Sequence, residues 1–264
     1  MKTITAVTIA SSDSGGGAGV PADLLTFAAH GVHGAAVLVA VTAQDTSRIH
    51  AIEPLSAGII HKQMDAVFGD LRPRAAKIGA LYDAARIRAV VSGLTRHRAK
   101  NVVLDPVLVS KGGRRLLASS ARAALVNSLF PLCDLVTPNL PEAEALSGIR
   151  IRSDADRREA ARALAAKGAG AVLVKGGHSR GDGITDLLFD GRRFLEIPGR
   201  RRKTRATHGL GCTLSSAIAA NLALGRGLEE AVRLGIEYLR VALARGIFPG
   251  RGWGTPGRIG ARSA

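Results

Sequence analysis

The segment Thr207–Thr213 carries residue types that could hold and transfer an anionic group. It reads THGLGCT and runs directly into a predicted helix, Gly211–Leu224. Free amides at a helix start bind anions, and glycines leave such a site unobstructed. The positive helix end should lower the pKa of the Cys212 thiol, which would then accept a proton from a substrate hydroxyl while the amides hold the developing charge. The alternative is a Gly-rich turn with a small buried cysteine, and His208 is expected to be structural or a donor on the phosphate side.

A lysine ends one of the apolar runs. Lys175 closes the predicted strand Ala171–Lys175 and precedes a Gly-Gly-His sequence. Packing alone does not explain a charged residue at the end of a buried strand. A cation in this position would neutralise phosphate charge during transfer, which is the role the sequence favours.

Two further segments indicate contact with a small ligand. Residues 11–19 read SSDSGGGAG and follow a predicted strand. Glycines let the backbone approach a ligand, although a tight turn with a helix N-cap explains them equally well. The spacing matches neither the dinucleotide fingerprint nor the phosphate-loop motif. Gln44 follows the next strand, and its amide, which both donates and accepts hydrogen bonds, suits the edge of a nitrogen heterocycle or caps a strand end.

Oxygen-bearing side chains follow two other predicted strands. Asp105 comes after one strand, and Asn139 and Glu142 come after the next. Carboxylate and amide oxygens at neighbouring strand ends are suitable ligands for Mg²⁺ and its waters. Asn139 as an N-cap with Glu142 as its capping-box partner is an equally good interpretation.

Short apolar runs alternate with helical patterns and must position these residues. The predicted strands are Ile4–Ala10, Ala35–Thr42, Ala75–Gly79, Val102–Leu104, Leu135–Thr137 and Ala171–Lys175. The predicted helices between them are Val20–Ala29, Ser56–Phe68, Asp83–Thr95, Ser119–Leu129, Pro141–Leu146 and Ser153–Lys167. Because the strands do not alternate between polar and apolar residues, we expect a mostly parallel sheet with helices on both faces. Ligands of such α/β sheets bind at the carboxyl ends of the strands.

The pattern changes in the last third of the chain. A late β-hairpin is predicted around Asp190-Gly191, with strands at Ile184–Phe189 and Arg193–Ile197. Two closing helices are predicted at Gly211–Leu224 and Leu228–Arg245. The tail after Pro249 is expected to be irregular. Without an internal repeat or a Pro-rich linker in the sequence, residues 1–264 are expected to form a single domain.

The composition is that of a folded protein. The chain has 264 residues, of which 46% are hydrophobic and 22% charged. These values exclude disordered and collagen-like chains, and no apolar stretch approaches the roughly 18 residues of a membrane span. Two cysteines are too few for a disulfide framework or a four-cysteine zinc site, and Cys133 is expected to be a buried packing residue. The N-terminal apolar run is too short for a signal peptide, so a cytoplasmic location is expected.

The charge is strongly basic, with 37 Lys and Arg against 21 Asp and Glu, a formal net charge of +16. Such a balance is compatible with a nucleic-acid partner. The aromatic content of 3% argues against base stacking and favours a basic surface that serves phosphate substrates. The densest run, residues 200–203, is expected on a solvated loop.

Taken together, these segments resemble the hydroxymethylpyrimidine/phosphomethylpyrimidine kinases of thiamine biosynthesis, within the ribokinase superfamily. The resemblance covers nearly the whole chain in order. The matching segments are Ser12–Val20, Ala22–Leu24, Thr26–Phe27, Val41–Thr46, Lys77–Ala80, Asp105–Val107, Thr137–Asn139, Val174–His178 and Thr207–Ser215. It implies a ribokinase-like three-layer sandwich, a homodimer, and two ATP-dependent steps. The first phosphorylates 4-amino-5-hydroxymethyl-2-methylpyrimidine, and the second converts the monophosphate to the diphosphate.

The resemblance also assigns roles to individual residues. The pyrimidine would be held by Gln44 and Asp23, in a pocket lined by Val107. The residues facing the ATP phosphates would be Lys175, Asn139 and Thr207, and those supporting Mg²⁺ would be Asp105 and Glu142. The anion hole would consist of Gly209, Leu210, Gly211 and Cys212, with Cys212 at the position where other superfamily members carry a catalytic Asp.

Several positions depart from the family pattern, mostly on the nucleotide side. Leu210 replaces the anion-hole Thr, Leu25 replaces a Lys, Ala206 replaces an Asn, and residues 112–114 read Gly-Gly-Arg in place of Ser-Gly-Asp. These changes bear on rate and on phosphate-donor preference more than on the fold. Two alternatives remain: a pyridoxal or pyridoxine kinase, and a non-catalytic nucleic-acid-binding or regulatory paralogue.

Overall fold

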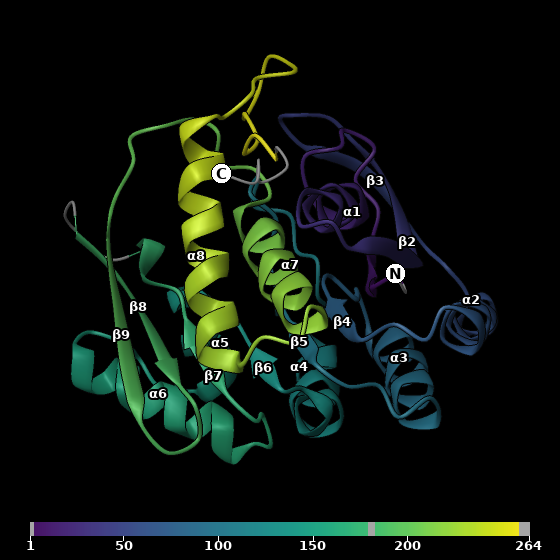
Figure 1. Cartoon of the computed structure of the whole chain (residues 1–264), viewed down its shortest axis with the longest axis horizontal. Coiled ribbons are helices and arrows are strands. Elements are labelled where there is room, and N and C mark those ends of the chain that lie inside the picture. The colour runs from purple at the N-terminus through teal and green to yellow at the C-terminus, as the bar shows by residue number, and fades with distance from the viewer. Residues whose placement is uncertain (1–2, 179–182, 259–264) are drawn as a thin grey trace.

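The computed structural model describes residues 3–178 and 183–258 (Figure 1). Its strands form one sheet in the order β3-β2-β1-β4-β5-β6-β7-β8-β9. Their bounds are β1 Thr5–Ser11, β2 His33–Gln44, β3 Ile49–Pro54, β4 Ala75–Ile78, β5 Val102–Leu104, β6 Leu135–Val136, β7 Val172–Val174, β8 Gly183–Phe189 and β9 Phe194–Arg200. The strands from β2 to β7 in this order pair in parallel, whereas β3, β8 and β9 are antiparallel to their neighbours.

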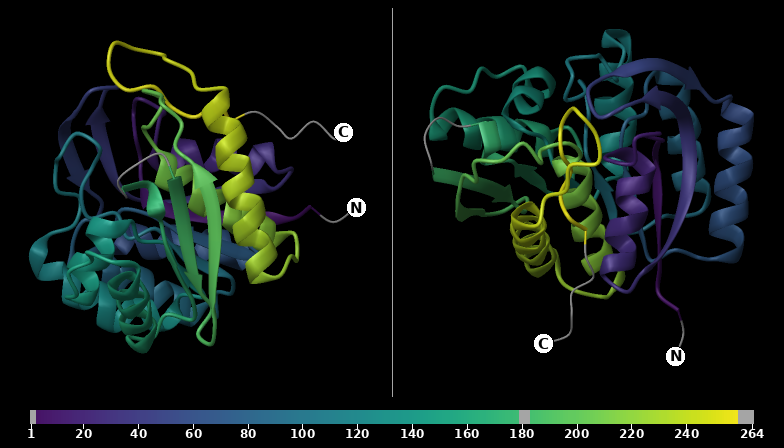
Figure 2. Two further views of the ribbon diagram at one scale, coloured as in Figure 1. Left: turned by 90° about the vertical axis from the view of Figure 1, so that its left-hand side faces the viewer. Right: turned by 90° about the horizontal axis from the view of Figure 1, so that it is seen from above.

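Helices cover both faces of the sheet (Figures 1 and 2). Their bounds are α1 Gly19–Ala29, α2 Ala57–Asp70, α3 Ala84–Arg96, α4 Arg122–Ala124, α5 Leu140–Ser147, α6 Asp154–Ala166, α7 Leu210–Ala223 and α8 Leu228–Ala244. One apolar core lies between the sheet and α2, α3, α5 and α6, and contains Ile60, Ile87 and Leu164. The other lies beneath α1, α7 and α8 and contains Phe27, Ile218 and Ile236. The predicted mostly parallel α/β sandwich with a late hairpin is confirmed.

The structure contains one strand that was not predicted from the sequence, and one predicted helix has an irregular form. β3 pairs antiparallel with β2 at the sheet edge, and the sequence-based prediction contained no strand there. The predicted helix Ser119–Leu129 is helical throughout but irregular: it is 3₁₀ at Ser119–Ala121, α-helical in α4 and π-helical at Leu125–Leu129, and a further 3₁₀ turn follows at Phe130–Leu132. Pro131 sits at the start of the last turn, where its missing backbone N–H is tolerated.

The segment after α8 returns across the molecule as an irregular strap, residues 246–258, drawn in yellow in Figures 1 and 2. An isolated bridge between Ile247 and Thr255 closes the strap on itself. The Thr255 hydroxyl donates to the Gly17 carbonyl at 3.3 Å, and Arg258 donates to the same oxygen at 2.7 Å. The strap therefore lies against the Gly-rich loop that follows β1.

Among the described residues, no helix combines the length and the apolar character that crossing a lipid bilayer requires. Cys133 is buried, as predicted, and its thiol donates to the Leu129 carbonyl at 3.2 Å.

Candidate active site

A cavity of about 700 Å³ opens at the carboxyl ends of the parallel strands. It is lined by residues that follow β1, β2, β5, β6 and β7 and by the start of α7. The predicted site residues that line it are Gln44, Asp105, Val107, Asn139, Glu142, Lys175, Thr207, Gly209, Leu210, Gly211 and Cys212. The fold thus brings together residues that lie far apart in the chain. Asp23 is the predicted site residue that does not line the cavity.

Close backbone packing shapes the start of α7. Gly209 precedes the helix with φ +77°, and a Cβ there would lie 2.1 Å from the Gly17 carbonyl oxygen. A Cβ on Gly211 would lie 2.6 Å from Asp105 Oδ2. Position 209 therefore requires glycine, and a side chain at Gly211 would displace Asp105. With glycine at both positions, the first amides of α7, which have no carbonyl partners within the helix, meet the cavity without side-chain obstruction. This geometry suits an anion.

Cys212 lies on the first turn of this helix, but its acidity differs from the prediction. Burial raises the pKa of its thiol. Lys77 opposes this shift, whereas the carboxylates of Asp23 and Asp105 add to it. The expectation that the helix end lowers the thiol pKa is therefore wrong for the ligand-free protein, because desolvation of the thiolate outweighs the favourable charges.

Lys175 and Asp105 form an ion pair within the cavity wall. Lys175 Nζ lies 2.7 Å from Asp105 Oδ1, and the Asp105 side chain is only 3% exposed. Burial acts to lower the pKa of Lys175, but the negative charges of Asp105 and Glu142 outweigh it and raise that pKa. A fixed cation therefore stands at the end of β7, as the sequence predicted.

Asn139 and Glu142 form the capping box that the sequence left as an alternative. The Asn139 amide oxygen accepts from the Glu142 N–H at 2.9 Å, and the Glu142 carboxylate accepts from the Asn139 N–H at 2.8 Å. Burial raises the pKa of Glu142 to about 7, an effect that Lys175 opposes and Asp105 reinforces. Both residues also line the cavity, so their structural role does not remove them from it.

The Thr207 hydroxyl is buried and has no hydrogen-bond partner among the described residues. Such a group costs free energy unless a ligand or water satisfies it. Thr207 lines the cavity next to the start of α7, so a ligand there is a candidate partner for its hydroxyl.

Asp23, which the sequence assigned to substrate binding, lies outside the cavity lining and has three donor partners within the protein. Its side chain is fully buried and pairs with Lys77 Nζ at 2.8 Å. It also accepts hydrogen bonds from the hydroxyls of Thr8 at 2.6 Å and Ser216 at 2.7 Å. These three donors engage both carboxylate oxygens, and Asp23 does not line the cavity.

Lys77 lines the cavity, although the sequence assigned it no role. It lies inside the apolar strand β4 and is fully buried. The signal that identified Lys175, a lysine in a buried strand, applied here as well. The positive charge of Lys77 interacts with the buried Asp23 carboxylate, and it opposes the rise in the pKa of the Cys212 thiol.

Basic side chains form one edge of the cavity. Arg200, Arg202 and Arg240 all line it, next to β9 and α8. Arg200 and Arg202 are exposed, as expected for a solvated run. Part of the strong positive charge of the chain is therefore directed at the cavity.

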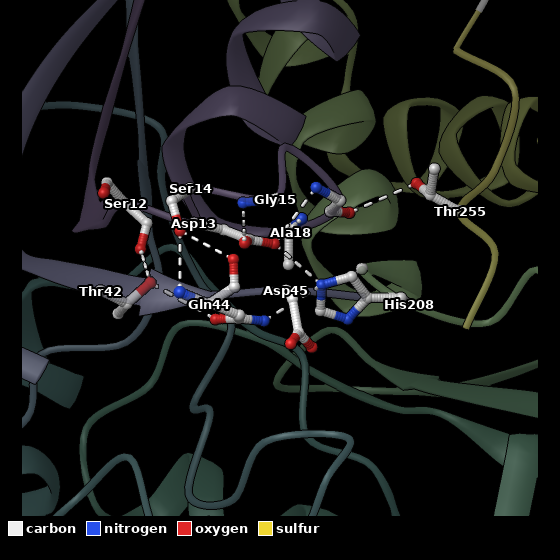
Figure 3. Close-up of polar contacts among 12 residues, drawn as sticks. Ser12, Asp13, Ser14, Gly15, Ala18, Thr42, Gln44, Asp45, His208 and Thr255 are labelled. Carbon is white, nitrogen blue, oxygen red and sulfur yellow. Dashed lines mark hydrogen bonds and ion pairs between the residues drawn. The ribbon is translucent and has the colours of Figure 1, made fainter. Parts of the chain in front are cut away.

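The Gly-rich loop after β1 is built around Asp13. Its carboxylate accepts from the backbone N–H groups of Gly15 at 2.8 Å, Gly17 at 3.1 Å and Ala18 at 2.8 Å. His208 Nε2 contacts the same carboxylate at 2.8 Å (Figure 3). The prediction of a phosphate-side role for His208 does not fit this contact, because the ring is directed toward Asp13 and Gln44.

Comparisons with known proteins agree with this arrangement. The family model described as "Phosphomethylpyrimidine kinase" matches residues 13–256. The chain is 50% identical over 243 residues to a hydroxymethylpyrimidine/phosphomethylpyrimidine kinase of Rhizobium meliloti, an alignment that covers 92% of this chain and 91% of the relative.

Solved structures show the same fold. A pyridoxal kinase of Bacillus subtilis in complex with ADP superposes with a TM-score of 0.89 at 34% identity, covering 96% of this chain and 97% of the other. A phosphomethylpyrimidine kinase of Clostridium difficile superposes with a TM-score of 0.81 at 42% identity, covering 90% and 98%. The chain therefore belongs to the phosphomethylpyrimidine kinase family.

Proposed function

We propose that this protein phosphorylates 4-amino-5-hydroxymethyl-2-methylpyrimidine and then its monophosphate, with ATP as the donor, in thiamine biosynthesis. The observation that carries this proposal is the meeting of Gln44, suited to a heterocycle, and the anion-binding start of α7 in one cavity. The close relationship to hydroxymethylpyrimidine/phosphomethylpyrimidine kinases supports it.

In the first step, the hydroxymethyl oxygen attacks the γ-phosphorus of ATP. A new O–P bond forms, the bond between the γ-phosphorus and the β–γ bridging oxygen breaks, and ADP leaves. The thiolate form of Cys212 accepts the hydroxyl proton, while the amides at Leu210 and Gly211 hold the negative charge of the migrating group. Val107 lines the pyrimidine end of the cavity. The second step repeats this chemistry with a phosphate oxygen as the attacking group.

The ATP phosphates are assigned to the side of the cavity formed by Lys175, Asn139 and Thr207. Lys175 supplies a fixed positive charge, and the Thr207 hydroxyl, which has no partner among residues 3–178 and 183–258, supplies a hydrogen-bond donor. The solved ADP complex of a similarly folded protein supports a nucleotide in this fold.

Mg²⁺ is the second expected cofactor. Among residues 3–178 and 183–258, no group of three or more His, Cys, Asp or Glu side chains could hold a metal alone. Asp105 and Glu142 are two carboxylates in the cavity wall, and Mg²⁺ in phosphoryl-transfer sites is bound by one or two carboxylates together with phosphate oxygens and water. The donor set therefore fits a magnesium ion that arrives with ATP and neutralises its phosphate charge.

A pyridoxal kinase is the second candidate, because the Bacillus subtilis pyridoxal kinase superposes with a higher TM-score than the Clostridium difficile enzyme. Purified protein incubated with Mg-ATP and each alcohol, followed by measurement of the phosphorylated products, separates the two. Efficient turnover of the pyrimidine with weak turnover of pyridoxal is expected. The opposite preference would overturn the proposal.

A homodimer is proposed from the family resemblance. Light scattering of the purified protein at micromolar concentration should give twice the chain mass of 27.4 kDa. A mass of one chain across the concentration range would contradict it.

A further inference from the structure

His208 contacts two cavity residues through a single ring atom (Figure 3). Its Nε2 lies 2.8 Å from Asp13 Oδ2 and 3.2 Å from the side-chain nitrogen of Gln44. The ring is tightly enclosed, because a Cβ on Gly17 would lie 2.2 Å from His208 Cδ2. The imidazole therefore has little freedom to change these contacts.

The Asp13 contact determines which ring nitrogen carries a proton. The Asp13 carboxylate accepts from the backbone N–H groups of Gly15, Gly17 and Ala18, and a carboxylate can only accept hydrogen bonds. A lone pair on His208 Nε2 would face that carboxylate at 2.8 Å and be repelled. Nε2 must therefore carry a hydrogen and donate it to Asp13, whether the ring is neutral or charged.

The orientation of the Gln44 amide follows from the same reasoning. With a hydrogen on His208 Nε2, the Gln44 atom beside it must be an acceptor, which is the amide oxygen. The contact at the other end of the amide agrees. Thr42 Oγ1 lies 3.4 Å from the second terminal atom of the Gln44 amide. The Thr42 hydroxyl has a better acceptor for its hydrogen in the Ser12 carbonyl, at 2.8 Å. A threonine hydroxyl has one hydrogen, so its neighbour on Gln44 must be a donor, which is the amide NH₂.

The backbone of Gln44 is fixed as well. The Ser14 hydroxyl donates to the Gln44 carbonyl at 2.7 Å and accepts from the Gln44 N–H at 2.8 Å. The loop that Asp13 organises therefore holds the backbone of Gln44, while His208 and Thr42 contact its side-chain amide.

We infer that His208 is a positioning residue that locks the Gln44 amide with its oxygen toward His208 and its NH₂ toward Thr42, and so selects heterocycles that place an N–H donor beside a ring-nitrogen acceptor. The inference rests on the proposed function, because a 4-aminopyrimidine has this pair along one edge. Its amine donates to the Gln44 oxygen, and its adjacent ring nitrogen accepts from the Gln44 NH₂.

The 4-oxo analogue of the substrate tests this selection, because it carries a carbonyl in place of the amine and a hydrogen on the ring nitrogen. On this edge the donor and the acceptor have exchanged places, so both are mismatched with the locked Gln44 amide. In His208→Phe the ring volume remains but the donor is lost, so Gln44 is free to rotate. The ratio of kcat/KM for the amino substrate to that for the oxo analogue should fall about tenfold. His208→Gln, whose amide reaches to a similar distance, should restore most of the ratio.

A purely structural role would lower both kcat/KM values together and leave the ratio unchanged, which would overturn the inference. The second measurement is made on the unmodified protein, so it holds even if His208→Phe does not fold. Long-range ¹H–¹⁵N correlation spectra of histidine-labelled protein should show His208 with a hydrogen on Nε2. A neutral ring protonated only on Nδ1 would overturn the inference. Failure of the wild type to phosphorylate either pyrimidine would count against the proposed function, whereas the position of the ring proton tests the positioning role separately.

Discussion

At the scale of single residues, the reaction depends most on the opposing influences that set the pKa of the Cys212 thiol. The helix N-terminus and Lys77 favour a thiolate, whereas burial and two carboxylates favour the neutral thiol, and the neutral form prevails. The free protein therefore presents a thiol at neutral pH. A proton acceptor of this kind becomes available only as the pH rises.

The pH profile should reveal this balance. Because kcat/KM reports ionisations of the free enzyme and the thiol pKa is raised above its ordinary value of 9.0, kcat/KM for the pyrimidine should climb from pH 7 to pH 9 without reaching a plateau. Steady-state rates across this range, with Mg-ATP and the pyrimidine both well below saturation, provide the check. A flat profile would mean that the thiolate is not the base.

Removing the thiol tests the same role directly. Cys212→Ala should lower kcat by about 10²-fold or more while KM for the pyrimidine stays nearly constant, since a proton acceptor acts in the transition state. Cys133→Ala is the matched control, because Cys133 is the other cysteine and is buried away from the cavity. Near-normal turnover of Cys212→Ala would refute the assignment.

Residue types and spacing predicted the fixed cation Lys175 and the capping alternative for Asn139, but not the fate of Asp23. The partners of Asp23 are Thr8, Lys77 and Ser216, which lie 15, 54 and 193 positions away in the chain. No local pattern reveals such a set, because only the folded sheet brings it together. The raised thiol pKa of Cys212 was missed for the same reason, since burial is a tertiary property.

At the scale of elements, the start of α7 works because two glycines let it pack against neighbouring backbone and side chains. Gly211→Ala would place a Cβ 2.6 Å from Asp105 Oδ2, so the carboxylate must move and its 2.7 Å contact with Lys175 must change. We expect kcat/KM for ATP to fall by about 10²-fold, the cost of a small misplacement at a reacting centre.

The matched control is Gly227→Ala at the start of α8, where nothing lies within 4 Å of the added Cβ. This variant should retain wild-type kinetics. Normal turnover of Gly211→Ala would contradict the proposed packing of the anion site.

Buried elements were predictable and peripheral ones were not. β5 matches its predicted bounds, Val102–Leu104, because a fully buried parallel strand appears in the sequence as an uninterrupted apolar run. β3 has mostly exposed or half-buried residues and ends at a proline, so its sequence lacks that signal. An edge strand of this kind forms because β2 offers it a partner, not because of its own composition.

At the scale of the whole molecule, the net charge of +16 and the arginines at the cavity edge should attract a polyanionic substrate. The Debye length falls from about 30 Å at 0.01 M salt to about 8 Å at 0.15 M. Over this range kcat/KM for ATP should decrease about threefold to tenfold, while KM for the uncharged pyrimidine changes little. Initial rates in a salt series would measure both values. Equal salt sensitivity for the two substrates would argue against electrostatic guidance.

The strap that follows α8 affects the order in which the protein can fold while it is being synthesised. Gly17 and Arg258, which meet beside the cavity, are separated by 241 positions in the chain. A ribosome exposes the Gly-rich loop long before it exposes the strap, so no nascent chain that still lacks the strap can make the contacts of Arg258 with that loop. These contacts therefore form only after every strand of the sheet, the last of which ends at Arg200, has been synthesised.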